Sequence, residues 1–243
     1  MQYLLIDNSN TRTKFALGSN QCLGKTISII PTSEISPSSL DSALKDITYD
    51  AVVLCSVVPE KAEIMADFFE GKPFHQLSSE SKLGIQIEYP NPNQIGADRL
   101  ANAIGVQTLF CSPAIVIDFG TAVTFDAIGS DDRYLGGVIA PGLASMTQNL
   151  AKRTALLPQI ELTEPTHAIG KSTTEAMLAG AVFGYRGLIK EIIHKLSEEM
   201  HTTPTVVATG GDAELIARGL PEIQHVSPTL TLEGIRIAAT LQF

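Results

Sequence analysis

One pattern occurs twice in the chain: an apolar run that ends in an aspartate, a short polar turn, and a second apolar run. The first copy, residues 5–18, reads LIDNSNTRTKFALG, and the second, residues 116–129, reads VIDFGTAVTFDAIG. Apolar runs of this length on either side of a turn predict paired strands. The repeat therefore predicts two lobes, residues 1–112 and residues 113–243, each opened by one hairpin, with a ligand cleft between them.

Strand-like and helix-like segments alternate along the rest of the chain, which predicts an α/β fold. The expected strands are residues 3–6, 14–17, 25–30, 51–58, 84–89, 114–117, 123–128, 136–139 and 205–208. The expected helices are residues 40–47, 59–70, 97–109, 143–152, 173–200 and 213–218.

Charge and length exclude several classes of protein. With 17 basic and 26 acidic residues the net charge is −9, and the basic residues are scattered, so the sequence predicts no nucleic-acid partner. The longest apolar run, residues 51–58, is too short to span a bilayer, so no membrane partner is expected.

Cysteine usage and the N-terminus favour a cytoplasmic protein. Cys22, Cys55 and Cys111 are odd in number and lack the spacing of a zinc site, so we expect reduced, partly buried thiols. The apolar run before Asp7 is short and has no basic residues before it, unlike a secretory signal peptide.

Both hairpins carry groups that suit a nucleoside triphosphate. An aspartate at a strand end, Asp7 or Asp118, can hold a hydrated Mg²⁺ against phosphate, and the turn supplies amide and hydroxyl donors. The first copy adds a cation at Lys14, and the second places Thr121 in the turn. A plain hairpin turn explains either copy alone, because the same residue types are common in turns. Two copies in one α/β chain favour a phosphate site.

A third segment, residues 206–213 (VVATGGDA), is an apolar strand followed by two glycines and a helix start. Gly210 and Gly211 allow a flat ligand such as adenosine to approach the backbone. An ordinary strand-to-helix turn explains the segment nearly as well.

The long helix expected at residue 173 has a marked start and an unusual face. Ser172 and Glu175 fit a capping box, in which each side chain bonds the other's backbone. Gly180, Gly184 and Gly187 share one side of the helix, which suggests that another backbone packs closely there, either within the chain or in a second subunit.

Taken together, the motifs resemble type III pantothenate kinase, a family of the acetate and sugar kinase/Hsp70/actin superfamily. The resemblance runs over nearly the whole chain. It rests on the first hairpin, on IDFGTAVTFD, and on four further segments: YPNPNQIGADR (residues 89–99), GGVIAPG (136–142), IGKST (169–173) and TGGDA (209–213). It implies two duplicated ribonuclease H-like lobes with a nucleotide cleft, and ATP-dependent phosphorylation of pantothenate to 4'-phosphopantothenate, the first step of coenzyme A biosynthesis.

The resemblance also implies roles for single residues. Asp98 matches the proton acceptor, Asp118 the ligand of a monovalent cation (K⁺ or NH₄⁺), and Asp7 a ligand of Mg²⁺ through water. The implied pantothenate contacts are Tyr89, Gly96, Ala97, Asp98, Arg99 and Thr173. The implied ATP contacts are Asp7, Asn8, Ser9, Asn10, Thr11, Arg12, Thr13, Lys14, Thr121, Gly210 and Gly211. The family further implies a homodimer with the substrate site near the subunit boundary.

Ser9 departs from the family pattern, which has glycine at that position. If the turn requires a positive φ there, serine costs roughly 1 kcal/mol or more. Since Asp7, Asn10, Thr11 and Lys14 are retained, we expect altered ATP affinity rather than loss of function.

Two other functions remain open on the sequence. One is a kinase of the same superfamily for another small hydroxylated substrate, because the nucleotide hairpins would serve it equally. The other is a non-catalytic regulatory protein of the same fold, with Ser9 marking a decaying site. Asp98 and Arg99 alone would also suit a solvated pair in the first turn of an amphipathic helix.

Overall fold

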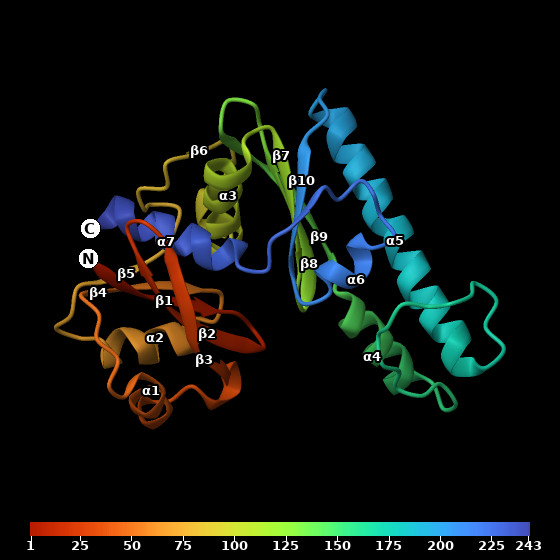
Figure 1. Ribbon diagram of the computed structural model, residues 1–243, viewed down its shortest axis with the longest axis horizontal. Helices are drawn as coiled ribbons and strands as arrows, with labels where there is room; N and C mark the ends of the chain where they lie inside the picture. The colour runs from red at the N-terminus through yellow and green to blue at the C-terminus, as the bar shows by residue number, and fades with distance from the viewer. The chain divides into compact units, whose positions relative to one another are not determined.

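The computed structural model describes residues 1–243, which fold as two compact units. Unit 1 comprises residues 1–111, 132–134 and 229–243, and unit 2 comprises residues 112–131 and 135–228. Figure 1 labels the helices and strands of both. The main division falls beside the predicted boundary, but the C-terminal residues, expected in the second lobe, belong to unit 1.

Unit 1 is built on a five-stranded sheet in the order β3-β2-β1-β4-β5. The central strand β1 pairs antiparallel with β2 and parallel with β4, so the ends of β1 and β4 meet at one edge. The strands are β1 (Gln2–Asn8), β2 (Arg12–Ser19), β3 (Leu23–Pro31), β4 (Ala51–Ser56) and β5 (Phe74–Gln76). A separate short strand, β6 (Gln86–Ile87), pairs with Arg133 and Tyr134.

Helices cover both faces of this sheet (Figure 1). On one face, α1 (Pro37–Leu44) and α2 (Pro59–Phe68) pack on alternate buried residues of β1, Leu4 and Ile6. On the other lie α3 (Ala97–Phe110) and α7 (Leu230–Gln242), joined by a buried hydrogen bond from Thr231 Oγ1 to Asn102 Oδ1 of 2.8 Å. Two 3₁₀ turns complete the unit, η1 (Thr32–Glu34) and η2 (Pro92–Gln94).

Unit 2 repeats the hairpin arrangement, with strands in the order β11-β10-β7-β8-β9. The central strand β7 pairs antiparallel with β8 and parallel with β10, as β1 does with β2 and β4. The strands are β7 (Ala114–Phe119), β8 (Ala122–Ile128), β9 (Arg133–Pro141), β10 (Thr205–Gly210) and β11 (His225–Val226). The helices α4 (Leu143–Arg153), α5 (Thr173–Glu199) and α6 (Ala213–Ala217) all contribute to one apolar core with β7, β8 and β10.

The prediction of an α/β fold is confirmed, and most expected elements are present. Three elements were not expected: α7 and the short edge strands β5 and β11. The expectation for the cysteines was wrong in part, because Cys22 and Cys111 are exposed and only Cys55 is buried. No helix of the chain is both long and apolar enough to cross a bilayer.

The long helix α5 starts as predicted, with one difference. Ser172 accepts a hydrogen bond from the Glu175 amide at 3.2 Å, but Glu175 accepts from the Lys171 amide rather than from Ser172. Gly180, Gly184 and Gly187 face open space within the chain. Close packing of another backbone of this chain against the glycine face is therefore ruled out.

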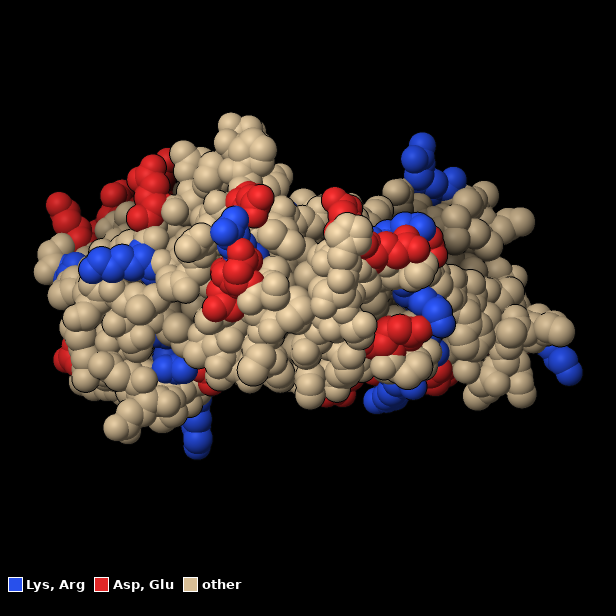
Figure 2. Space-filling view, turned by 90° about the horizontal axis from the view of Figure 1, so that it is seen from above, with Lys and Arg blue, Asp and Glu red and all other residues tan.

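On the face drawn in Figure 2, Lys and Arg side chains are spread out and form no single patch, while several Asp and Glu side chains lie close together at the upper left. Ion pairs also form within one element, such as Lys195 with Glu198 on α5 at 2.9 Å. The scattered distribution of basic residues that the sequence predicts is thus seen on this face.

Candidate active site

The first hairpin places a buried carboxylate beneath an exposed turn. In the β1–β2 register Asp7 faces Lys14, and Asp7 is only 3% exposed. Lys14 Nζ lies 3.3 Å from Asp7 Oδ2, and Ser9 Oγ donates to Asp7 Oδ1 at 2.9 Å. The next three residues, Asn10 to Arg12, are exposed. The turn therefore combines a fixed negative charge with accessible donors for phosphate.

Ser9 fits this turn without the backbone conformation that would require glycine. Among non-glycine residues a positive φ occurs at Asp46, Cys111, Asp132 and His201, and not at Ser9. The Ser9 amide instead donates to the Arg12 carbonyl at 3.2 Å, closing the turn. The strain considered for serine is thus absent, and its hydroxyl adds a contact to Asp7.

Asp98 lies in the first turn of α3, with Gly96 at the N-cap. Asp98 Oδ1 accepts from the Arg99 amide at 2.8 Å, and a Cβ on Gly96 would lie 2.5 Å from the same oxygen. Glycine at position 96 lets the carboxylate fold back over the helix start, since a side chain there would displace it. Burial raises the pKa of Asp98 above its usual value, the negative charge of Asp7 raises it further, and Arg99 opposes both. The acceptor segment, residues 96–99 with Asp98, and the first hairpin thus interact electrostatically within unit 1.

Aromatic rings lie beside Arg99. Its guanidinium carbon lies 5.9 Å from the centre of the Tyr134 ring, and the Tyr89 and Tyr134 rings are 6.4 Å apart. This contact orients a planar cation that can bind carboxylate or phosphate in two places at once. Tyr134 was missed from the sequence, because it lies far along the chain from the GADR segment.

Gly96 and Ala97 line a pocket of about 500 Å³ in unit 1. Its walls also include Ser56 at the end of β4 and Asn93 from η2, and Ser79 Oγ donates to Asn93 Oδ1 at 2.6 Å. The surface next to the predicted acceptor segment is therefore rich in hydroxyl and amide groups.

In unit 2, the second hairpin touches the glycine pair of the third motif. Gly210 has φ +92°, and a Cβ there would lie 2.7 Å from Asp118 Oδ1. The Gly211 amide donates to the Phe119 carbonyl at 3.0 Å. Only glycine fits at position 210, because both the backbone angle and the space exclude a side chain. The Asp118 turn and the TGGDA turn thus form one surface.

Thr121 is exposed at the tip of the second hairpin, and its carbonyl oxygen accepts two hydrogen bonds. It accepts from the Gly142 amide at 3.1 Å and from Ser145 Oγ at 2.8 Å, so the start of α4 fixes the turn. Thr173, the first residue of α5, is also exposed, but none of these contacts involves it.

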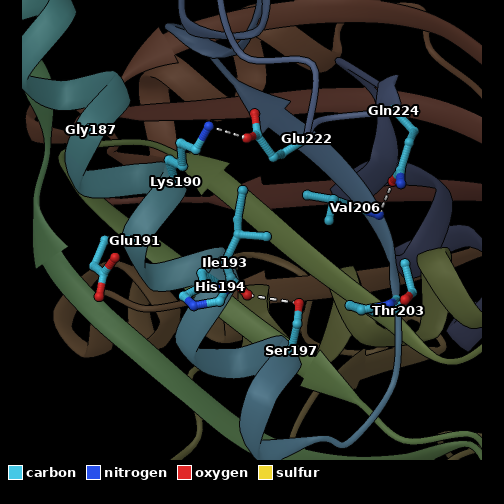
Figure 3. Close-up of a pocket in the computed structure, with 11 residues that line it drawn as sticks. Gly187, Lys190, Glu191, Ile193, His194, Ser197, Thr203, Val206, Glu222 and Gln224 are labelled. Carbon is cyan, nitrogen blue, oxygen red and sulfur yellow. Dashed lines mark hydrogen bonds and ion pairs between the residues drawn. The ribbon is translucent and has the colours of Figure 1, made fainter.

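Another pocket of unit 2, of about 530 Å³, contains none of the predicted site residues (Figure 3). Between α5 and the start of β10, Lys190 pairs with Glu222 at 2.7 Å, and Gln224 accepts from the Val206 amide.

Similar folds are found among solved kinases. A polyphosphate/ATP-glucomannokinase from Arthrobacter sp. strain KM covers 100% of this chain, and 99% of its own length is matched, with a TM-score of 0.51 at 14% identity. A Campylobacter jejuni protein described as a Baf family transcriptional activator gives 0.62 at 20% identity, with 98% and 97% covered. Structural similarity at such low sequence identity shows only that the folds are alike. Fold and hairpins together define the chain as an α/β protein of two units, each built around one copy of the hairpin.

Sequence comparison identifies the family. The sequence model of type III pantothenate kinase matches residues 3–195. A type III pantothenate kinase of Akkermansia muciniphila is 57% identical over 241 residues, which cover 99% of each chain. The chain belongs to the type III pantothenate kinase family.

Proposed function

We propose that the chain transfers the γ-phosphoryl group of ATP to the primary hydroxyl of pantothenate, giving 4'-phosphopantothenate for coenzyme A biosynthesis. The observation that carries this proposal is the placement of Asp98. It is a partly buried carboxylate with a raised pKa, at a helix start, within reach of the charge of Asp7 in the hairpin that suits phosphate.

Asp98 accepts the proton of the attacking hydroxyl as the bond from that oxygen to the γ-phosphorus forms and ADP leaves. Phosphoryl transfer requires mainly positioning and charge neutralisation, so the base orients the hydroxyl and takes its proton late. Arg99, oriented by Tyr134, binds the carboxylate of pantothenate or the transferred phosphoryl group, and Tyr89 packs beside it. Gly96 and Ala97 leave room for the substrate.

The first hairpin holds the phosphates of ATP through the exposed donors of Asn10, Thr11 and Arg12, with Lys14 as the cation. Asp7 is suited to hold Mg²⁺ through a bound water molecule, because one protein carboxylate together with phosphate oxygens is a common set of magnesium ligands. When bound, Mg²⁺ neutralises charge on the phosphates. Asp7 itself stays fixed by Ser9 and Lys14.

The joined turns of unit 2 carry the predicted contacts for adenosine and for the second phosphate motif. Gly210 and Gly211 leave space for adenosine, and Thr121 contacts the phosphates. Asp118 supplies an oxygen ligand for K⁺ or NH₄⁺, supported by its position beside the Gly210 backbone. The cation screens the carboxylate of Asp118 from the phosphates.

A homodimer accounts for the exposed glycine face of α5. Gly180, Gly184 and Gly187 have no neighbour within the chain, and Phe183 between them is 39% exposed. Small residues let a second backbone approach closely, and an exposed aromatic is typical of subunit contacts. Thr173, at the start of the same helix, would then lie near the subunit boundary.

We also propose that the protein works in the cytoplasm.

Replacement of Asp98 tests the mechanism. Asp98→Asn keeps the size and the acceptor oxygen but removes the base, so we expect pantothenate-dependent turnover to fall roughly 10²–10⁴-fold while ATP binding persists. Turnover is measured by ADP release, and ATP binding by calorimetry. Asp41→Asn, at an exposed position on α1, is the matched control and should turn over normally. Unchanged turnover in Asp98→Asn would remove Asp98 from the mechanism.

A further inference from the structure

Beneath the first hairpin lies a chain of hydrogen bonds that joins two side chains of the hairpin motif, Asn8 and Thr13, to two that lie outside every motif, Ser56 and Thr32. Ser56 Oγ donates to Asn8 Oδ1 at 2.6 Å, and Asn8 Nδ2 donates to Thr13 Oγ1 at 2.7 Å. Thr13 Oγ1 lies 3.1 Å from Thr32 Oγ1, which donates to the Ser9 carbonyl at 2.6 Å. Four side chains from β1, β2, β4 and η1 thus end on the backbone of the phosphate turn.

The direction of these hydrogen bonds follows from counting donors. The hydroxyl hydrogen of Thr32 is used on the Ser9 carbonyl, so Thr32 Oγ1 must accept from Thr13. Thr13 Oγ1 then accepts from the amide of Asn8, whose oxygen accepts from Ser56. Every donor in the chain points toward the turn, and hydrogen bonds aligned in this way strengthen one another.

Three members of the chain are almost completely buried. Asn8 is 1% exposed, Thr13 0% and Thr32 3%. Buried hydroxyl and amide groups are costly unless paired, and apolar side chains would fill such space without this cost. Each buried side-chain oxygen and nitrogen of these three residues has a hydrogen-bond partner, which indicates that orientation is their contribution.

Both ends of the chain reach candidate site surfaces. At one end, Thr32 holds the Ser9 carbonyl, and its amide donates to the Thr11 carbonyl at 3.0 Å. At the other, Ser56 accepts from the Val58 amide at 3.1 Å and lines the pocket that Gly96 borders. All of these residues belong to unit 1.

We propose that Ser56, Asn8, Thr13 and Thr32 form a positioning relay that sets the backbone of the turn from Ser9 to Arg12 for ATP. They act through the turn and do not touch the nucleotide. For Asn8 and Thr13 this replaces the direct ATP contact implied by the family resemblance. The inference rests on the proposed role of the first hairpin in binding ATP.

Variants of Thr32 test the relay. Thr32→Val keeps the shape and removes the donor to Ser9, so we expect the KM and Kd for ATP to rise about five- to tenfold. The KM for pantothenate should stay within about twofold, because the relay acts on the ATP turn. Thr32→Ser restores the hydroxyl and should return ATP binding to near the original value.

Thr231→Val is the matched control. Thr231, on α7, is also buried in unit 1 and donates to a side chain, but its partner Asn102 on α3 takes no part in the relay. Both valine variants should lower the melting temperature, and only Thr32→Val should weaken ATP binding. Equal weakening in both, or none in Thr32→Val, would overturn the relay.

A double variant tests whether the members act as one unit. Since Thr32→Val already breaks the last link, adding Ser56→Ala should weaken ATP binding little further, whereas independent contributions would multiply. ATP binding is measured by calorimetry without pantothenate. If the unaltered protein binds ATP but does not phosphorylate pantothenate, only the substrate assignment fails. If it does not bind ATP, both proposals fail.

Discussion

At the scale of single residues, Ser9 shows how a departure from a family motif is accommodated. The sequence allows a strained turn, whereas Ser9 has no positive φ. Its hydroxyl donates a hydrogen bond to Asp7, and its carbonyl accepts one from Thr32. The partners that make serine suitable, Asp7 and Thr32, are separated from one another along the chain. The sequence alone therefore could not decide the effect of Ser9.

The raised pKa of Asp98 predicts a gain in stability when its charge is removed. Burial and Asp7 favour the protonated form in the folded state, so ionised Asp98 lowers the free energy of unfolding. The penalty is fully present above the folded pKa and is absent below the unfolded one. Asp98→Asn should thus melt at a higher temperature than the unaltered protein at about pH 8, and the difference should shrink as pH falls through the folded pKa.

This prediction is checked by calorimetric melting of both proteins from about pH 8 to about pH 5, with Asp41→Asn as control. In this size range, a change of about 1 kcal/mol moves the melting temperature by roughly 2–4 °C. A lower melting temperature for Asp98→Asn at pH 8 would contradict the assigned cause of the pKa shift.

At the scale of elements, the strands and helices that carry the motifs are present as predicted, and some packing elements were missed. The helix α7 was missed, although its less buried residues Glu233, Ile237 and Thr240 recur at helical spacing. β5 and β11, of three and two residues, are too short to give an alternating signal. The Glu175 side chain accepts a hydrogen bond from the amide of Lys171 and not, as predicted, from the amide of Ser172. Composition does not determine which of the two neighbouring amides it bonds.

Arg186 on α5 joins three segments of unit 2. It is buried, donates to Glu164 at 2.8 and 2.7 Å, and donates to the carbonyls of Ile216 and Leu215 at the end of α6 at 3.1 and 2.6 Å. It thereby fixes both the irregular segment after α4 and the helix that follows the TGGDA turn.

Removing one partner of Arg186 tests this role. Glu164→Gln removes a charge but keeps one acceptor, and the Glu164 side chain is 40% exposed, so solvent screening limits the loss to about 1 kcal/mol. Urea unfolding measures this loss. Glu161→Gln, an exposed neighbour on the same segment, should change the free energy of unfolding by much less. Equal values for both variants would show that the pair contributes nothing.

At the scale of the whole molecule, the duplicated hairpin predicts two lobes, and each of the two units contains one copy of it. It could not predict that residues 229–243 return to unit 1, because no local pattern records which sheet a terminal helix covers. The same limit applies to the site. Asp7, Asp98 and Asp118 stand in motifs, while Thr32, Ser56 and Tyr134 become relevant only through folding.

The most direct test of pantothenate phosphorylation is ADP release by the purified protein with ATP, Mg²⁺ and pantothenate, in potassium and again in sodium alone. We expect ADP release that requires pantothenate and is faster in potassium, the latter because Asp118 is proposed as a ligand of a monovalent cation. A folded protein that binds ATP but releases no ADP on addition of pantothenate, in either salt, would contradict the proposed reaction.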